Sequence, residues 1–88
     1  MSNLLHRPAM TDVQWYVEDA DDMRTWRIPS TTLDGLTAAR ELGEAWWHRS
    51  GDYCAEFELT IVTPPRFAGR YYFTVESEPV FYVREIKP

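Results

Sequence analysis

Residues 30–50 read STTLDGLTAARELGEAWWHRS, and this stretch carries the one helical pattern of the chain. Its hydroxyl groups can cap a helix start, and Thr31 followed by Asp34 approximates a capping box. Gly51 suits the left-handed position that ends many helices. One arc of the helix is formed by Leu36, Ala39, Leu42, Gly43, Trp46 and Trp47. We therefore predict an amphipathic helix over Thr32–Ser50.

Gly43 lies on this arc, although glycine costs on the order of 1 kcal/mol of helix propensity relative to alanine. A missing side chain beside Ala39 lets a helix backbone approach a sheet closely. Gly43 therefore predicts the point where helix and sheet come nearest to each other.

Five shorter stretches around the helix alternate apolar and polar residues with the two-residue period of strands. Residues 13–17 and 23–28 precede the helix, and the acidic loop between them predicts a hairpin. Residues 53–62, 70–76 and 80–86 follow the helix, separated by proline-containing turns. The order ββαβββ predicts an α+β two-layer sandwich, with one helix on one face of an antiparallel sheet of about five strands.

A single helix covers one face of such a sheet, so the other face is left for solvent or a partner. We expect this open face to carry Tyr16, Arg24, Glu56, Glu58 and Tyr72. In the last strand two sets of residues compete for the inner face, and the sequence does not choose between them. One set is Phe81 and Val83, and the other is Val80, Tyr82 and Ile86.

The length of 88 residues is enough for one hydrophobic core. We assign residues 12–88 to a single α+β domain, and residues 1–11, which lack a period, to a flexible N-terminal arm. The single cysteine, Cys54, cannot form an intrachain disulfide, which favours a reducing compartment, the cytoplasm. No apolar run has the length of a signal peptide or a membrane span, so we expect neither export nor a membrane partner.

Fourteen acidic and nine basic side chains give the chain a formal net charge of -5. A protein of this sign gains no counterion-release attraction to phosphate backbones, so we expect no direct nucleic-acid partner. The charge suits a protein that docks on a basic protein surface.

No catalytic, metal or cofactor pattern is present in the sequence, so we expect a non-enzymatic protein without metal or cofactor. The acidic loop lacks the central glycine and the distant glutamate of a calcium-binding loop. His48, Asp52 and Cys54 are close in sequence, but a cysteine nucleophile also needs a concave site and oxyanion donors. We therefore expect Cys54 to be dispensable.

Four tryptophans and five tyrosines exceed what one small core must hide. Either some of them form an exposed aromatic face, as is typical of a protein-binding surface, or all four indoles pack under the helix. We predict that a partner binds the acidic hairpin and the open face through Glu18, Asp19, Asp21, Asp22, Glu56, Glu58 and Tyr72.

The segments Trp15-Tyr16-Val17-Glu18, Trp26-Arg27-Ile28-Pro29 and Leu36-Thr37-Ala38-Ala39-Arg40-Glu41-Leu42 form a hairpin followed by an alanine-rich helix. This layout resembles small inhibitor proteins of phages and mobile elements, including anti-CRISPR proteins of similar size and acidity. The likeness covers about 30 residues and is one of layout, so no functional residue carries over. It implies a non-enzymatic inhibitor that blocks a host nucleoprotein complex, such as a CRISPR effector complex, in the host cytoplasm.

Other functions stay open. The layout also resembles partial ribonuclease H-like antitoxins, although the Gly-Cys pair common on their second strand is missing, so an antitoxin-like or adaptor module is one alternative. Single-stranded nucleic-acid binding is another, on a stacking platform of Arg66, Phe67, Arg70, Tyr71 and Tyr72. The oligomeric state is open as well, with a dimer among the options.

Overall fold

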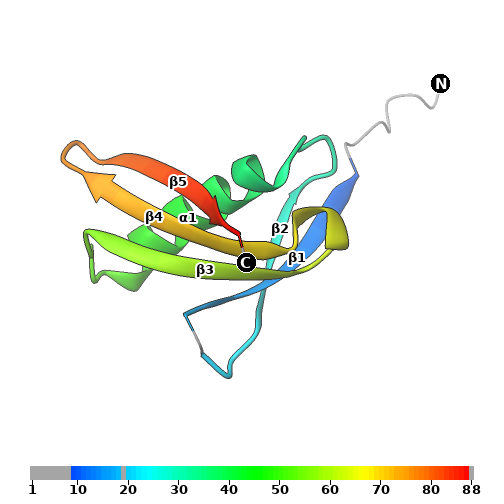
Figure 1. The fold of residues 1–88 in the computed structure, drawn as a ribbon. Coiled ribbons are helices and arrows are strands. Elements are labelled where there is room, and N and C mark those ends of the chain that lie inside the picture. Colours follow the sequence, from blue (N-terminus) through cyan, green and yellow to red (C-terminus); the bar gives the residue numbers. More distant parts are fainter. Residues whose placement is uncertain (1–8, 19, 88) are drawn as a thin grey trace.

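The computed structural model describes residues 9–18 and 20–87. These residues form one five-stranded sheet with a single helix laid across one face (Figure 1). The elements are β1 (Met10–Val17), β2 (Arg24–Pro29), α1 (Gly35–Ser50), β3 (Glu56–Thr63), the 3-10 helix η2 (Pro65–Phe67), β4 (Gly69–Glu76) and β5 (Val80–Ile86). The predicted α+β fold with the order ββαβββ is confirmed. The arm predicted over residues 1–11 falls mostly outside the described residues, and Met10 and Thr11 begin β1.

The strands lie in the order β2-β1-β3-β4-β5, and each neighbouring pair is antiparallel. Because β2 and β3 both pair with β1, they run in the same direction. The helix α1 carries the chain across the sheet from the end of β2 to the start of β3. It packs mainly on β3, β4, β5 and η2, so β1 and β2 are covered less closely.

The hydrophobic core lies between α1 and the sheet. Alternating residues of β1, β3 and β4 are buried there as predicted, namely Val13, Trp15, Phe57, Leu59, Ile61, Tyr71 and Phe73. Phe57 and Phe73 are directly opposed and stack with ring centroids 4.6 Å apart. The buried residues of α1 are Ala38, Ala39, Leu42 and Gly43. A Cβ atom on Gly43 would lie 2.7 Å from Cζ of Phe73, so the predicted close approach is confirmed.

The helix begins at Gly35 rather than at the predicted Thr32. Asp34 is the N-cap, because its backbone is extended and its Oδ1 accepts a hydrogen bond from the backbone N–H of Thr37 at 2.8 Å. Carboxylates cap helices as well as hydroxyl groups do. Leu36, predicted to face the sheet, is 45% exposed, because Ala38 completes the buried arc instead.

Two strands also differ in detail from the sequence pattern. The strand after the helix begins at Glu56 rather than Tyr53, because Tyr53 has left-handed backbone (φ 48°) and an exposed side chain. In β5, the open choice is decided: Phe81 is buried and Val83 packs against the core. Tyr82 points to the other side and is 52% exposed.

The Asp34 cap should make the stability of the protein depend on pH. The hydrogen bond from the backbone N–H of Thr37 to the carboxylate lowers the pKa of Asp34 below its ordinary value of 3.8. A group with a lowered folded-state pKa stabilises the fold above its unfolded pKa, and this contribution is lost as the pH falls through the folded pKa. We expect Asp34→Asn, which keeps a capping oxygen, to melt below wild type at neutral pH. The difference between the two melting temperatures should shrink below pH 3.8. A constant difference across that range would contradict the role of the charge.

Candidate functional site

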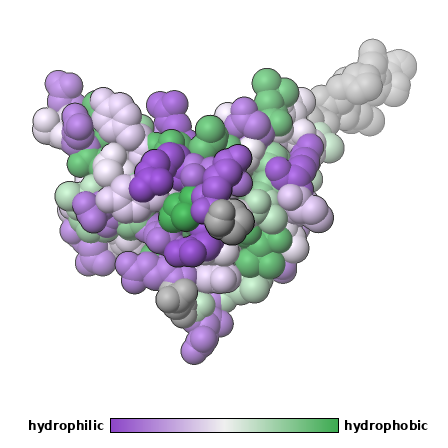
Figure 2. Space-filling view, viewed as in Figure 1, coloured by the Kyte–Doolittle hydropathy of each residue, from purple (hydrophilic) through white to green (hydrophobic). Residues whose placement is uncertain are grey.

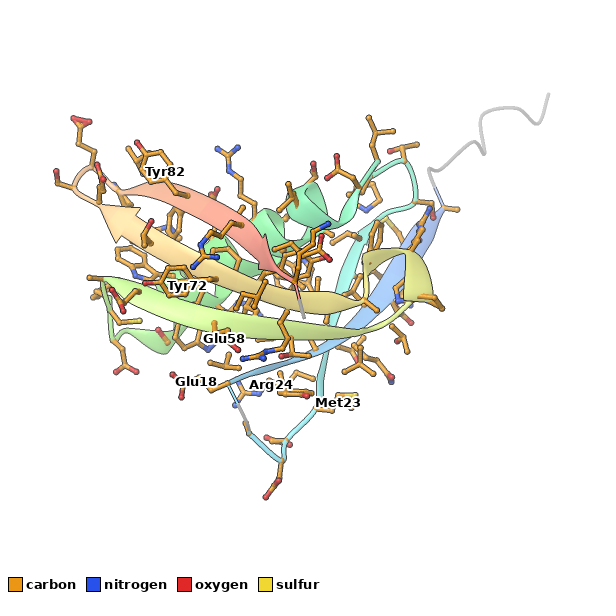
Figure 3. All side chains as sticks on the ribbon, viewed as in Figure 1. Glu18, Met23, Arg24, Glu58, Tyr72 and Tyr82 are labelled. Carbon is orange, nitrogen blue, oxygen red and sulfur yellow. The ribbon has the colours of Figure 1, made fainter. Side chains whose placement is uncertain are left out.

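The face of the sheet opposite α1 is not covered by any other described element, and its side chains point to solvent (Figure 3). Strand pairing places Glu58 of β3, Tyr72 of β4 and Arg84 of β5 directly opposite one another. Glu18 extends this line beyond β1, where its backbone N–H donates to the carbonyl oxygen of Glu58 at 3.1 Å. We call Glu18, Glu58, Tyr72 and Arg84 the central row.

Neighbouring side chains hold the central row in place. Arg70 donates from both Nε and Nη2 to Oε2 of Glu58, at 2.9 and 2.6 Å. The guanidinium of Arg84 lies 4.9 Å from the centre of the Tyr72 ring, within cation–π range. Desolvation, followed by the hydrogen bond and charge of Glu56, raises the pKa of Tyr72 above its ordinary value. The open face is therefore an ordered network of both charge signs.

A shallow hollow of about 350 Å³ lies in this face. It is lined by Glu18, Glu56, Phe57, Glu58, Arg70 and Tyr72. Four of the residues predicted to bind a partner thus meet in one place, namely Glu18, Glu56, Glu58 and Tyr72. From the same side, Figure 2 shows hydrophilic residues gathered across the middle of the molecule.

Many of the acidic residues lie at the connections that meet one end of the strands, although the twist of the sheet separates these connections, with the β1–β2 loop at the bottom of Figure 1 and the β4–β5 turn at its upper left. The topology brings three connections to this end: β1 to β2, α1 to β3, and β4 to β5. The described carboxylates at these connections and the adjoining strand ends are Glu18, Asp21, Asp22, Asp52, Glu56, Glu58, Glu76 and Glu78. We call this set the acidic end.

The remaining predicted partner residues belong to the acidic end but not to the hollow. Asp21 and Asp22 are exposed on the β1–β2 loop. Neither lines the hollow of the open face. Asp19 lies outside the described residues. The residues predicted to bind a partner therefore form two groups, one that lines the hollow and one on the β1–β2 loop. Glu18 lines the hollow at the start of that loop.

Arg70 and Arg84 belong to this site, although the sequence does not single them out as partner-binding residues. Strand alternation places both on the same face as Tyr72, so their side of the sheet is readable from the sequence. Their contacts are not. The bond from Arg70 to Glu58 depends on the register between β4 and β3, which the sequence pattern leaves open.

Arg24, which is expected on the open face, lies on the opposite side of the sheet. It pairs with Trp15 across β1 and β2, and directly opposed residues point to the same face. Trp15 is buried beneath the helix, and Arg24 lines a cavity with it. All four tryptophans pack in or against the core on that side. The aromatic residues of the open face are therefore tyrosines.

Cys54 lacks the environment of an activated nucleophile. It is half-buried, and burial raises the pKa of its thiol, as does the charge of Asp52. A nucleophilic cysteine needs a lowered pKa. The neighbouring His48 ring lies against Trp47, with centroids 5.2 Å apart. The thiol thus stays protonated at neutral pH.

Within residues 9–18 and 20–87, no three or more His, Cys, Asp or Glu side chains are grouped so that they could hold a metal ion. No helix in this part of the chain has the length and apolar character needed to cross a membrane. Comparison of the chain with models of protein families, with curated proteins and with solved structures gave no match.

Proposed function

We propose that the protein is a non-enzymatic inhibitor of the anti-CRISPR type, encoded by a phage or mobile element, that acts by binding a protein in the host cytoplasm. The observation that carries this proposal is the continuity of the central row with the acidic end, since Glu18 and Glu58 belong to both. The partner presents a basic surface. A nucleoprotein complex such as a CRISPR effector has such a surface where it holds nucleic acid.

The charge distribution supports a basic partner. Asp21 and Asp22 are exposed on the β1–β2 loop, and the ion pair from Asp22 to Arg24 is long, at 3.9 Å. On the open face Glu58 is paired with Arg70, whereas the exposed Glu56 adds charge beside it. Unpaired charges of one sign steer a partner of the opposite sign and raise its association rate.

Two tyrosines supply contact area beside these charges. Tyr82 is 52% exposed, and Tyr72 is held by Arg84 on one side and Glu56 on the other. Tyrosine is enriched among residues that dominate binding energy. A side chain that is already ordered loses less conformational freedom on binding. Tyr72 is therefore the expected centre of the interface.

The burial of two rings of the nucleic-acid stacking platform, Phe67 and Tyr71, argues against that alternative. Phe67 is only 1% exposed, and the Arg66 guanidinium lies 4.5 Å from its ring centre. Arg70 is bound to Glu58. A base cannot reach the Phe67 ring face in this arrangement. An adaptor or antitoxin would use the same surface as the inhibitor, and would differ in leaving the CRISPR effector active.

The first test compares a loop charge reversal with a matched control. Asp21→Lys/Asp22→Lys reverses two exposed charges of the acidic end, and Glu41→Lys/Glu44→Lys reverses two on the helix, on the other side of the sheet. Partners captured from host lysate by wild-type and variant proteins are identified by mass spectrometry, and the binding rates are then measured with the purified partner. We expect the loop variant to associate about tenfold more slowly and to lose much of the salt dependence. The helix variant should behave as wild type.

A second set of variants tests the direct contacts of the interface, which affect dissociation, apart from the long-range charges, which affect association. Tyr72→Ala should speed dissociation by roughly tenfold or more, as truncation of a central interface residue does. Arg84→Gln should give a smaller effect, because it only loosens the tyrosine. Wild type should also block nucleic-acid binding by a captured effector complex. Tight binding of bare RNA or DNA by the protein, or equal rates for the two charge-reversal variants, would contradict the proposal.

A further inference from the structure

β5 is an edge of the sheet, with β4 as its one strand neighbour among the described residues. Figure 1 shows its outer side facing away from the other strands. It pairs with β4 in an unbroken register from Val80 to Ile86. In the described part of the chain, no backbone group outside β4 hydrogen-bonds to the backbone of β5. Alternate residues of a strand direct their N–H and C=O groups to opposite sides, so the outer side of β5 is a template for a further strand.

The side chains of β5 also leave this edge open. Two that point to the open face are well exposed, Val80 at 39% and Tyr82 at 52%. Edge strands are commonly protected from further pairing by proline, lysine or a bulge, and β5 has none of these. At the opposite edge, β2 ends in Pro29, and Arg24 points a charge to the helix side. β5 is therefore the edge with fewer obstacles to pairing.

The sequence of β5 is complementary to itself when two copies pair antiparallel about Val83. Directly opposed residues point to the same face, so the axis of a twofold pair passes through a residue. Centring the pair on Val83 gives every one of the seven strand residues a strand partner. Centring it on Tyr82 or Arg84 leaves two residues of each strand without one. An Arg84 centre also places two like charges opposite each other, which is destabilising.

On the open face, the Val83-centred register covers the exposed residues of β5. Val80 lies opposite Ile86 of the second copy, and Tyr82 lies opposite Arg84. Symmetry makes each of these pairs twice. Arg84 already lies 4.9 Å from the ring centre of Tyr72, its neighbour on β4. Its guanidinium therefore lies between two tyrosines in the pair, in a second cation–π contact.

The helix side of the same register suits a second copy better than an unrelated strand. Glu85 points to this side, since it lies opposite the buried Tyr71. A charge that points inward at an edge opposes the docking of another strand. In the self-paired register Glu85 lies opposite Phe81, whose ring centre is 6.1 Å from that of His48. The exposed imidazole of His48 can donate a hydrogen bond to this carboxylate, so the second copy brings the donor that the charge needs.

We propose that two copies of the protein pair antiparallel through β5, centred on Val83, so that two five-stranded sheets become one. The interface consists of one strand pair and a few side chains on each face, so it belongs to the weak class of small interfaces. The open faces of both copies stay uncovered and continue into each other. The pairing needs no other protein, so its test does not depend on the proposed inhibitor function.

Analytical ultracentrifugation of the protein alone, from about 1 µM to about 1 mM, measures the pairing. We expect the apparent mass to rise from monomer to dimer, with a Kd in the micromolar range. Tyr82→Arg places two like charges opposite each other twice, and should raise the Kd by about tenfold or more. Adding Arg84→Glu makes the opposed charges unlike and should recover most of the affinity. Thr25→Arg is the matched control, because it adds the same charge to an exposed residue of β2, and it should keep the wild-type Kd.

Single cysteines in the Cys54→Ser background test the register. Val83→Cys should cross-link under mild oxidation, because Val83 is directly opposed to its own copy in the proposed pair. Tyr82→Cys or Arg84→Cys alone should not, since its own copy is more than about 7 Å away, which a disulfide does not span. A mixture of these two variants should form the mixed disulfide, and it reports the register if Val83→Cys does not fold. The proposal is overturned if the protein stays monomeric over the whole range, if Tyr82→Arg pairs like Thr25→Arg, or if Tyr82→Cys or Arg84→Cys alone cross-links as readily as the expected pairs.

Discussion

Replacing Gly43 by leucine is expected to destabilise the protein by about 1–3 kcal/mol, even though leucine is the better helix former. A Cβ at this position would lie 2.7 Å from Cζ and 2.9 Å from Cδ2 of Phe73. The Phe73 ring cannot move aside, because it is fully buried and stacked on Phe57. The helix α1 would have to move away from the sheet, which would loosen the packing of its buried residues before and after Gly43.

Denaturant unfolding followed by circular dichroism measures this effect. Gly43→Ala should shift the midpoint in the same direction by a smaller amount. Glu41→Ala changes an exposed residue of the same helix, and we expect its free energy of unfolding to stay within about 0.5 kcal/mol of wild type. An unchanged or raised midpoint for Gly43→Leu would mean that the helix does not meet the sheet at Gly43.

Truncation of Phe73 to alanine is expected to cost about 3–5 kcal/mol, because it removes a fully buried ring and leaves a cavity between α1 and β3. The stack with Phe57 is lost with it. For a domain with a total stability of about 5–15 kcal/mol, this is a large share. Phe73→Leu should cost less, since it keeps part of the apolar volume.

The two positions should be coupled. With Phe73 present, Gly43→Ala destabilises because the new methyl group meets the ring. In the Phe73→Ala background the methyl group has room, so the same change should stabilise through helix propensity. A double-mutant cycle on unfolding midpoints measures this reversal of sign. If Phe73→Ala does not fold, Phe73→Leu serves as the background, where the cost of Gly43→Ala should shrink. Additive effects would contradict direct contact between the two residues.

The alternation of the strands is readable from the sequence because burial on one face repeats every second residue. Phe57, Leu59 and Ile61 therefore point to the core as predicted. The first and last residues of helices and strands are harder to predict from the sequence, because they depend on local capping hydrogen bonds and backbone conformation. Asp34 replaces a hydroxyl as the helix cap, and the left-handed backbone at Tyr53 delays the start of β3.

The candidate site divides in the same way. The sequence alone places Glu56, Glu58 and Tyr72 on the uncovered face, because they alternate with buried neighbours. The alternation of β2 continues through Arg24, so that residue joins Trp26 and Ile28 on the helix side, opposite to its expected face. The alternation of the sequence therefore already indicates its side, and the pairing of Arg24 with Trp15 agrees with it.

The sequence by itself determined the order of elements, the faces of the central strands and the position of the helix glycine that meets the sheet. These depend on periodicity within a few neighbouring residues, which a linear pattern contains. Only the tertiary structure decided the contact of Arg70 with Glu58, the placing of carboxylates at the same end of several strands, and the cavity between Trp15 and Arg49. Each of these joins segments distant in sequence. Their proximity is set by strand register and by the path of the helix across the sheet, because packing of the whole chain selects both.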